Sequence, residues 1–266
     1  FIDTAVNYTN GAAEQILGRF AKAQRDRLVL ATKFTMARDP TNINAGGNHR
    51  YNLVRSVETS LRQLDTDRID LMYLHAWDFT TQPDEVMRAL DDLVRGGKVL
   101  YLGICNTPAW RVAELQTLAD LRGWAPLVAL QIEYSLVERT VEHELLPMAK
   151  ALGLGVLPWS PLGGGILTGK YTRDDLSDEN GADVASSRKG VIASIGHLNE
   201  RSLAIAEVVG EVAGELGVSR SQVAIAWTLA NPAVVSPIIG ARTVAQAEDN
   251  LGALTAFARR RPGLSL

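Results

Sequence analysis

The chain has 266 residues and carries 27 Lys and Arg against 30 Asp and Glu, a formal net charge of −3. This balance gives no support for binding nucleic acid or a membrane surface, and no apolar run approaches the roughly 20 residues of a membrane span. A single cysteine, Cys105, excludes an internal disulfide framework, and without a signal peptide we expect a cytoplasmic protein.

Seven short runs of β-branched and apolar residues predict strands, and each ends on residues able to do chemistry. The runs are residues 1–3, 28–32, 69–74, 99–104, 128–130, 156–158 and 234–239. In the same order they end on Asp3, Lys33, His75, Cys105-Asn106, Gln131, Trp159-Ser160 and Gly240. In an α/β barrel the carboxyl ends of the strands line one mouth, so these endings predict one shared site.

Amphipathic segments of helical period follow almost every predicted strand. We expect helices at residues 13–24, 52–64, 84–95, 108–121, 141–152, 200–216 and 244–257, with a short additional helix at 219–229. Alternating strands and helices are typical of parallel βαβ construction, so the predicted fold class is α/β. Two polar stretches, residues 34–51 and 171–199, are predicted loops at the active-site end.

The number of predicted strands bears on the architecture. A single (β/α)8 TIM barrel takes about 250 residues, so we expect one barrel domain over residues 1–266. Seven strands would leave two exposed edges where eight close a barrel. Because Phe1 lies inside a predicted strand, we expect the first βα unit to be missing before Phe1.

Asp3, Lys33 and His75 end three consecutive strands, and Tyr8 lies in the loop that leaves the first of them. Neighbouring strands are about 4.8 Å apart, so these side chains are expected within reach of one another. An ammonium favours a nearby phenolate, so Lys33 is expected to lower the pKa of Tyr8, with Asp3 holding Lys33 protonated. His75 can donate a hydrogen bond to a carbonyl oxygen. Taken singly, Asp3–Lys33 is equally a structural ion pair and His75 a core histidine, but their joint occurrence favours carbonyl chemistry.

The later strand endings carry residues of a different kind. Asn106 and Gln131 offer amides that suit a carboxamide, and Trp159 offers a flat face for a ring. Residues 160–165, Ser-Pro-Leu-Gly-Gly-Gly, form a backbone that can approach a phosphate closely. Arg242 lies where the amino end of a helix can attract another phosphate. A nicotinamide dinucleotide fits this set, and hydride transfer follows, with a carbonyl half and a cofactor half facing each other.

Nearly the whole chain resembles the aldo-keto reductases. The matching motifs are Phe1-Ile2-Asp3-Thr4-Ala5 with Tyr8 and Gly18, Ala31-Thr32-Lys33, Ile-Asp-Leu-Met-Tyr-Leu-His at 69–75, Gly97-Lys98-Val99 with Gly103, Gln131-Ile132-Glu133-Tyr134-Ser135, residues 159–171 and residues 238–250. Each motif is common alone, whereas their order and spacing are specific. The resemblance implies an NADPH-dependent reductase of aldehydes or ketones on a (β/α)8 barrel. It makes Tyr8 the proton donor, Lys33 the modulator of its pKa, Asp3 the partner of Lys33 and His75 the orienting donor.

The resemblance also implies where NADP binds. The matching positions are Cys105, Asn106 and Gln131 near the carboxamide; Trp159 on the nicotinamide; Ser160, Pro161, Leu162, Gly164 and Lys170 at the pyrophosphate; and Gly240, Arg242, Gln246 and Asn250 at the adenosine and 2′-phosphate. Cys105 stands where many members have serine, and Gln246 where some have arginine. Arg242 must therefore supply the charge for the 2′-phosphate. No metal site is predicted.

Two other functions compete with carbonyl reduction. The Trp-Ser-Pro-Leu loop at Trp159 is similar to that of potassium-channel β subunits, which makes an NADPH-binding regulatory or sensor subunit the alternative. A Schiff-base aldolase would use Lys33 as its nucleophile, but Asp3 beside it opposes the depressed pKa that such a lysine needs. The expected partner is a small-molecule carbonyl substrate.

The substrate itself is not named by the sequence. Its determinants are expected at residues 6–7, 34–51 and 76–82, where Trp77 and Phe79 suggest an apolar or sugar-stacking wall.

Overall fold

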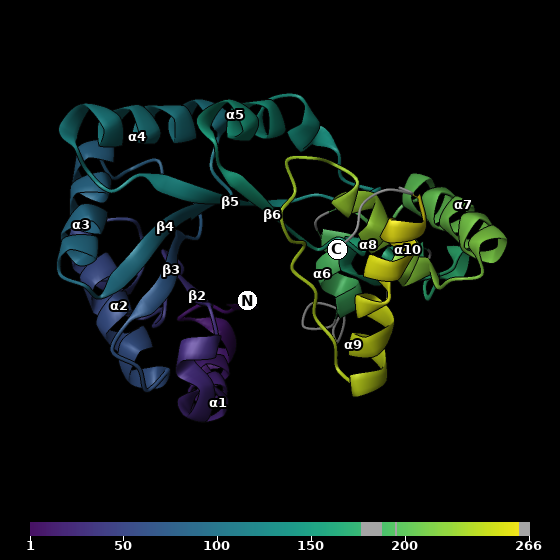
Figure 1. Cartoon of the computed structure of the whole chain (residues 1–266), viewed down its shortest axis with the longest axis horizontal. Helices are drawn as coiled ribbons and strands as arrows, with labels where there is room; N and C mark the ends of the chain where they lie inside the picture. The colour runs from purple at the N-terminus through teal and green to yellow at the C-terminus, as the bar shows by residue number, and fades with distance from the viewer. Residues whose placement is uncertain (177–187, 195, 261–266) are drawn as a thin grey trace. The chain divides into compact units, whose positions relative to one another are not determined.

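The computed structural model describes residues 1–176, 188–194 and 196–260 of the chain (Figure 1). These residues form two compact units, which we describe in turn. The first unit consists of Phe1–Gln131 and Glu144–Gly155, and the second of Ile132–His143 and Val156–Leu266 as far as the chain is described. The predicted loop at residues 171–199 falls partly outside the described residues.

Parallel strands form the core of the first unit. They are β1 (Ile2–Asp3), β2 (Leu30–Phe34), β3 (Ile69–Leu74), β4 (Val99–Cys105) and β5 (Leu127–Glu133), and the sheet order β1-β2-β3-β4-β5-β6 follows the chain. Every residue of β2 and β3 is buried, as expected for a parallel sheet covered on both faces. Lys33 of β2 pairs in register with Tyr73 of β3, which pairs with Gly103 of β4.

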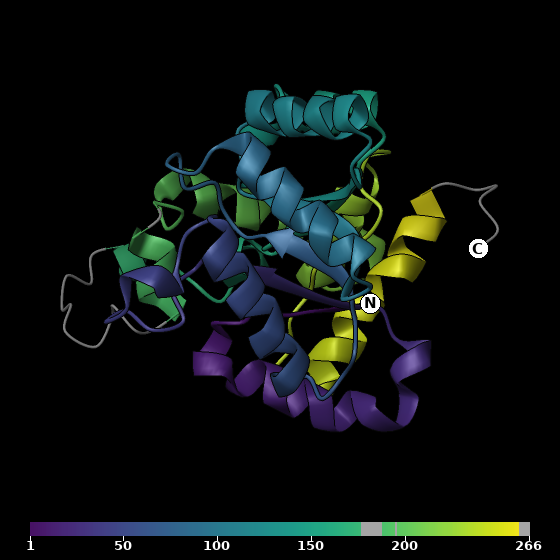
Figure 2. The same ribbon diagram turned by 90° about the vertical axis from the view of Figure 1, so that its left-hand side faces the viewer.

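A helix follows each of these strands, as the sequence predicts. The helices are α1 (Ala12–Ala21), α2 (Arg50–Gln63), α3 (Pro83–Arg95), α4 (Ala109–Arg122) and α5 (Leu145–Leu152), with short 3-10 segments η1 (Tyr8–Gly11), η2 (Lys22–Arg27) and η3 (Ile43–Ala45). Figures 1 and 2 show α2, α3 and α4 lying along one face of the sheet. The α/β class is therefore observed, and most predicted helix bounds are displaced by one to three residues.

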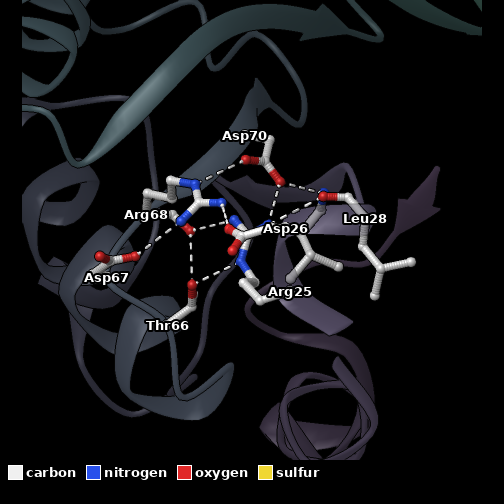
Figure 3. Close-up of polar contacts among 8 residues, drawn as sticks. Arg25, Asp26, Leu28, Thr66, Asp67, Arg68 and Asp70 are labelled. Atoms are coloured by element: carbon white, nitrogen blue, oxygen red, sulfur yellow. Dashed lines mark hydrogen bonds and ion pairs between the residues drawn. The ribbon is translucent and has the colours of Figure 1, made fainter. Parts of the chain in front are cut away.

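A buried polar network ties the amino-terminal ends of β2 and β3 together (Figure 3). Arg25 donates to Asp70 Oδ2 at 2.8 Å, to Thr66 Oγ1 at 2.8 Å and to the carbonyls of Leu28 and Arg68 at 3.1 and 2.9 Å. The same Asp70 oxygen accepts from the Leu30 backbone N–H at 2.7 Å. Asp70 is 8% exposed, so its charge depends on these partners in place of water.

Strand β6 (Gly155–Trp159) belongs to the second unit from Val156 onward. The predicted strand at residues 234–239 is not a strand: it makes one parallel bridge, Val156↔Val234, and donates from Val235 N and Ile238 N to β6. Prolines explain the shortfall, since Pro158 and Pro237 have no N–H to give to a ladder. Six strands are thus formed among the described residues, and a closed eight-stranded barrel is not observed there.

Helices make up most of the second unit. They are α6 (Arg188–Ser194), α7 (Glu200–Leu216), α8 (Arg220–Leu229), α9 (Val244–Leu251) and α10 (Ala253–Arg260), with 3-10 segments η4 (Thr140–Glu142), η5 (Gly163–Thr168) and η6 (Arg173–Leu176). The single helix predicted at 244–257 is divided at Gly252, where an added Cβ would overlap the Gln222 side chain. Helix α6 and η6 lie within the predicted loop at 171–199. Among the described helices, none has the length and apolarity to cross a membrane.

Candidate active site

Asp3 and Lys33 form a buried ion pair at the carboxyl ends of β1 and β2. Lys33 Nζ donates to Asp3 Oδ2 and, at 2.9 Å, to the backbone carbonyl of Thr4. The pairing of β1 with β2, with Asp3 opposite Ala31, brings the two side chains together. Lys33 is 1% exposed, and a charge so deeply buried requires a partner of this kind. The Thr4 carbonyl is a contact that no side-chain pattern in the sequence could indicate.

Tyr8 and His75 complete the predicted group of four. Lys33 Nζ lies 5.2 Å from the centre of the Tyr8 ring, and the Tyr8 and His75 rings meet edge to face with centroids 5.8 Å apart. Tyr8 opens η1 directly after the β1 loop and remains 39% exposed. The structure therefore gathers Asp3, Tyr8, Lys33 and His75, with Tyr8 accessible from outside.

The pKa of Tyr8 differs from the sequence expectation. Burial, followed by the negative charge of Asp3 and a smaller effect of Cys105, raises this pKa to about 12. The expectation that Lys33 lowers the pKa of Tyr8 is therefore wrong in its net direction. The main reason is burial of the phenol, and the Asp3 carboxylate, which touches the ammonium, opposes the field of Lys33 at the phenol. Tyr8 is consequently protonated at neutral pH, the form that a proton donor needs.

His75 is neutral at the same pH. Burial, and then the charge of Lys33, lower the pKa of His75 to about 4. Its Nδ1 is buried with no hydrogen-bond partner among the described residues. A neutral imidazole can donate one hydrogen bond without bringing a second positive charge beside Lys33.

We expect the His75 imidazole to titrate near pH 4 and to stay neutral through pH 6.5, because its charged form would be desolvated beside Lys33. The imidazole resonances in an NMR pH titration measure this directly. The linked stability has the same sign: the unfolded chain binds the His75 proton more readily, so folding loses stability as pH falls from about 6.5 towards 4.

A His75→Asn variant assigns the His75 signal and should remove its share of the pH-dependent stability. An inflection for His75 near pH 6.5 would contradict the neutral-donor role.

Gln131 contacts the Asp3–Lys33 pair directly. Its Nε2 donates to Asp3 Oδ1 at 2.9 Å, and the Cys105 Sγ lies 3.9 Å from its Oε1. Gln131 and Cys105 are register partners on β5 and β4 and are 3% and 1% exposed. Burial raises the pKa of the Cys105 thiol to about 12, so it is an uncharged neighbour. Gln131 thus orients the Asp3 carboxylate, which its identity as an amide did not reveal.

Asn106 lies at the edge of this group. It follows β4 with φ of 44°, in the left-handed region that asparagine tolerates better than most residues. Its Nδ2 donates to the His75 backbone carbonyl at 3.2 Å, and the residue is exposed. Strained backbone of this type is concentrated at functional sites, and the amide is positioned next to His75.

Tyr73 is a site residue that the sequence reasoning missed. It is fully buried, and its ring centre lies 5.9 Å from Lys33 Nζ. A Cβ at Gly103 would overlap this ring, so the glycine makes the space that Tyr73 fills. Burial and the Asp3 charge raise the pKa of Tyr73 well above its ordinary value. The sequence contained one indication of this role, because Tyr73 precedes His75 by two residues and so points to the same face of β3.

The second unit contains the predicted phosphate-binding loop. Trp159 is half-buried at the end of β6, and Ser160 follows with φ of 55°. Ser160 Oγ accepts from the Gly164 backbone N–H at 2.9 Å. Glycines 163, 164 and 165 all have positive φ, of 56°, 66° and 103°, which a chain of L side chains would resist. Pro161 is buried, Leu162 is half-buried, and Lys170 is exposed with Nζ 4.8 Å from the Tyr171 ring centre.

The segment predicted to bind adenosine lies after the extended residues 234–238. Gly240 is exposed, and space for a Cβ there is open. Thr243 caps α9 by accepting from Gln246 N at 3.2 Å, while Gln246 Oε1 accepts from Arg242 N at 2.9 Å. Asn250 is 5% exposed. Gln246 therefore organises the turn that presents Arg242, whose side chain is exposed.

These residues fit a dinucleotide. In the described part of the chain neither Lys170 nor Arg242 has an acidic partner within ion-pair distance, since their charges appear in none of the ion pairs formed there. The amino end of α9 supplies backbone N–H groups near Arg242, whereas the N–H groups of the three left-handed glycines of η5 donate to Ser160 and Leu162. Cations beside N–H-rich turns suit phosphate groups.

Comparison with known proteins gives a consistent result. The model of the Aldo/keto reductase family matches residues 1–259. The chain is 37% identical over 261 residues to a norsolorinic acid reductase of Aspergillus flavus, covering 96% of this chain and 63% of that protein. It is 39% identical to an uncharacterized oxidoreductase of Bacillus subtilis and 34% identical to a probable aryl-alcohol dehydrogenase of Saccharomyces cerevisiae, each over 96% of this chain and over 77% and 78% of those proteins. The chain thus spans under two thirds of the fungal reductase.

Proposed function

Because the chain belongs to the aldo/keto reductase family of oxidoreductases, we propose that it reduces an aldehyde or ketone to an alcohol with NADPH. The observation that carries this proposal is the placement of Tyr8 against the Asp3–Lys33 pair and the His75 ring. We further propose that the fold is a (β/α)8 barrel and that residues 1–266 belong to a single barrel domain.

The chemistry follows from the protonation states of the site. A bound NADPH supplies the hydride that adds to the carbonyl carbon. Tyr8, protonated at neutral pH because its pKa is about 12, gives its proton to the carbonyl oxygen. His75, neutral with a pKa of about 4, orients that oxygen by donating a hydrogen bond. Lys33 and Asp3 then face the phenolate left on Tyr8, which the ammonium stabilises.

The cofactor contacts that we propose follow the positions that match the aldo/keto reductase family. Asn106 and Gln131 would bind the carboxamide with Cys105 beside them, and Trp159 would stack on the nicotinamide ring. The remaining contacts would come from Ser160, Pro161, Leu162, Gly164, Lys170, Gly240, Arg242, Gln246 and Asn250. Support for these roles lies in the glycine conformations of η5 and in the charges of Lys170 and Arg242, which have no ion-pair partner within residues 1–176, 188–194 and 196–260.

An aryl carbonyl is the substrate class that we propose. One relative is named an aryl-alcohol dehydrogenase. Within the first unit, Phe79 is 68% exposed and lies in the loop that follows His75, with φ of 59°. Trp77 in the same loop is 5% exposed and fixed by the Arg111 guanidinium, 4.8 Å from its ring. A fixed indole and an exposed phenyl ring in the same loop suit a flat aromatic substrate.

The test is consumption of NADPH with paired aryl and alkyl aldehydes. We expect turnover with both and a lower KM for the aryl compounds. Phe79→Ala should raise the aryl KM by about two- to tenfold, the factor for one lost aromatic contact. The alkyl KM should change little.

Tyr101→Ala is the matched control for the Phe79 variant. Tyr101 is also an exposed aromatic, at 59%, but lies four residues before the end of β4. This variant should leave both KM values unchanged. Tight NADPH binding with no turnover on any carbonyl would refute reduction and favour the regulatory-subunit alternative.

A further inference from the structure

Arg220, the first residue of α8, extends between two glycines of neighbouring segments. A Cβ added at Gly169, at the end of η5, would overlap the Arg220 guanidinium and lie 2.8 Å from its Cζ. A Cβ at Gly210 of α7 would overlap the same group and lie 2.6 Å from Cζ. The two glycines therefore form a slot whose occupant is the guanidinium.

Hydrogen bonding fixes the guanidinium in this slot. Arg220 Nη1 donates to the Ala206 carbonyl of α7 at 3.1 Å. The charge also acts on Glu207, whose pKa is lowered first by Arg173 and to a lesser degree by Arg220. Arg220 thus links α7, α8 and the turn at Gly169 through one side chain.

Arg220 lies at the first turn of α8, where an arginine is not expected from helix electrostatics alone. A cation at the first turn of a helix opposes the helix dipole, so a solvated surface role gives no reason for arginine there. An open cavity of about 390 Å³ adjoins the side chain and is also lined by Tyr171, Arg173 and Glu207. This side of the Gly169 turn faces the cavity, so the Arg220 guanidinium is the group that supports the turn there.

We propose that Arg220 is a positioning residue for the loop that carries Lys170. By filling the slot between Gly169 and Gly210, Arg220 holds the last turn of η5 against α7, so that Lys170 is presented in one place to a phosphate of the dinucleotide. The effect of Arg220 on cofactor affinity rests on the proposed function, whereas the packing of Arg220 between the two glycines does not depend on that function.

A double-mutant cycle tests the slot by thermal unfolding. Gly210 lies inside α7 with an ordinary helical backbone, where alanine normally stabilises. We expect Gly210→Ala to lower Tm in the wild-type chain, because its Cβ displaces the guanidinium. In an Arg220→Ala background the same change should raise Tm, by about 2–4 °C. A rise of Tm in both backgrounds would overturn the slot.

Cofactor titration tests the positioning role. We expect Arg220→Ala to weaken NADPH binding about tenfold, the factor for reordering one backbone residue on binding. The kcat at saturating NADPH should stay within about twofold of wild type, and Arg220→Lys should recover part of the lost affinity.

The matched control is Arg173→Ala, which removes an arginine of the same cavity that pairs with Glu200 and Glu207 and overlaps neither glycine position. It should bind NADPH as wild type does. Equal affinity of wild type and Arg220→Ala would overturn the positioning role alone. A wild-type protein that does not bind NADPH would overturn the proposed function with it, while the Tm cycle still reports on the slot.

Discussion

Replacing Tyr8 with phenylalanine is expected to lower kcat for carbonyl reduction by about 10²- to 10⁴-fold, the usual contribution of a positioned proton donor. The ring would stay against Lys33 and His75, so the loss isolates the phenol proton. Because the pKa of Tyr8 is about 12, wild-type reduction should be level across neutral pH and should fall only as alkaline pH begins to remove that proton. Steady-state kinetics over pH measure both expectations.

Tyr101→Phe serves as the control for the Tyr8 variant, since it removes a phenolic oxygen from an exposed residue away from the carboxyl end of β4. Its kcat should equal that of wild type. NADPH affinity should be the same in both variants. A Tyr8→Phe protein that retains most of its kcat would show that another group delivers the proton.

Replacing Arg25 with alanine is expected to lower the free energy of unfolding by about 3–5 kcal/mol, the range for removing one partner of a buried ion pair. The variant removes the closer of the two guanidinium groups that contact Asp70, leaving Arg68 at 3.6 Å, and it removes one hydrogen bond from each of the carbonyls of Leu28 and Arg68 (Figure 3). Denaturant unfolding measures the change. We expect the Arg25→Ala variant to retain its catalytic activity below its melting temperature, because the network lies at the opposite ends of the strands from Lys33 and His75.

The control for Arg25 is Lys22→Ala. Lys22 pairs with Asp65 at 2.7 Å, but the two side chains are 73% and 63% exposed. An exposed pair of this kind contributes about 0–1 kcal/mol, so Lys22→Ala should change stability little. If Arg25→Ala were equally mild, the polar network would not be a stabilising element of the fold.

The sequence predicted the sheet of the first unit well, and the same reasoning predicted that Asp3, Lys33 and His75 lie together. Runs such as residues 69–74 have mostly apolar residues on both faces, as strands of a covered parallel sheet do. Parallel strands have their carboxyl ends at one edge, so Asp3, Lys33 and His75 could be expected side by side before any coordinates were known. The structure has them in that arrangement.

The predictions that failed depended on contacts between segments distant in sequence. Residues 234–239 have the composition of a strand, but the partner strand contains Pro158 and the run contains Pro237, so the ladder is reduced to one bridge. The helix at 244–257 is interrupted at Gly252, where the Gln222 side chain of α8 occupies the space beside the backbone. The contributions of Pro158 and Gln222 are not visible within the segments that they interrupt.

The sequence by itself determined which chemical groups end the strands, because strand periodicity and parallel pairing act locally and fix the face and the edge of each residue. Only the tertiary structure decided how those groups behave. Burial and the neutralising Asp3–Lys33 contact reversed the expected pKa shift of Tyr8, and Gln131 became a partner of Asp3. Arg220 gained a place between Gly169 and Gly210. Desolvation, charge cancellation and close packing exist only once distant segments meet, so residue order alone cannot fix their sign.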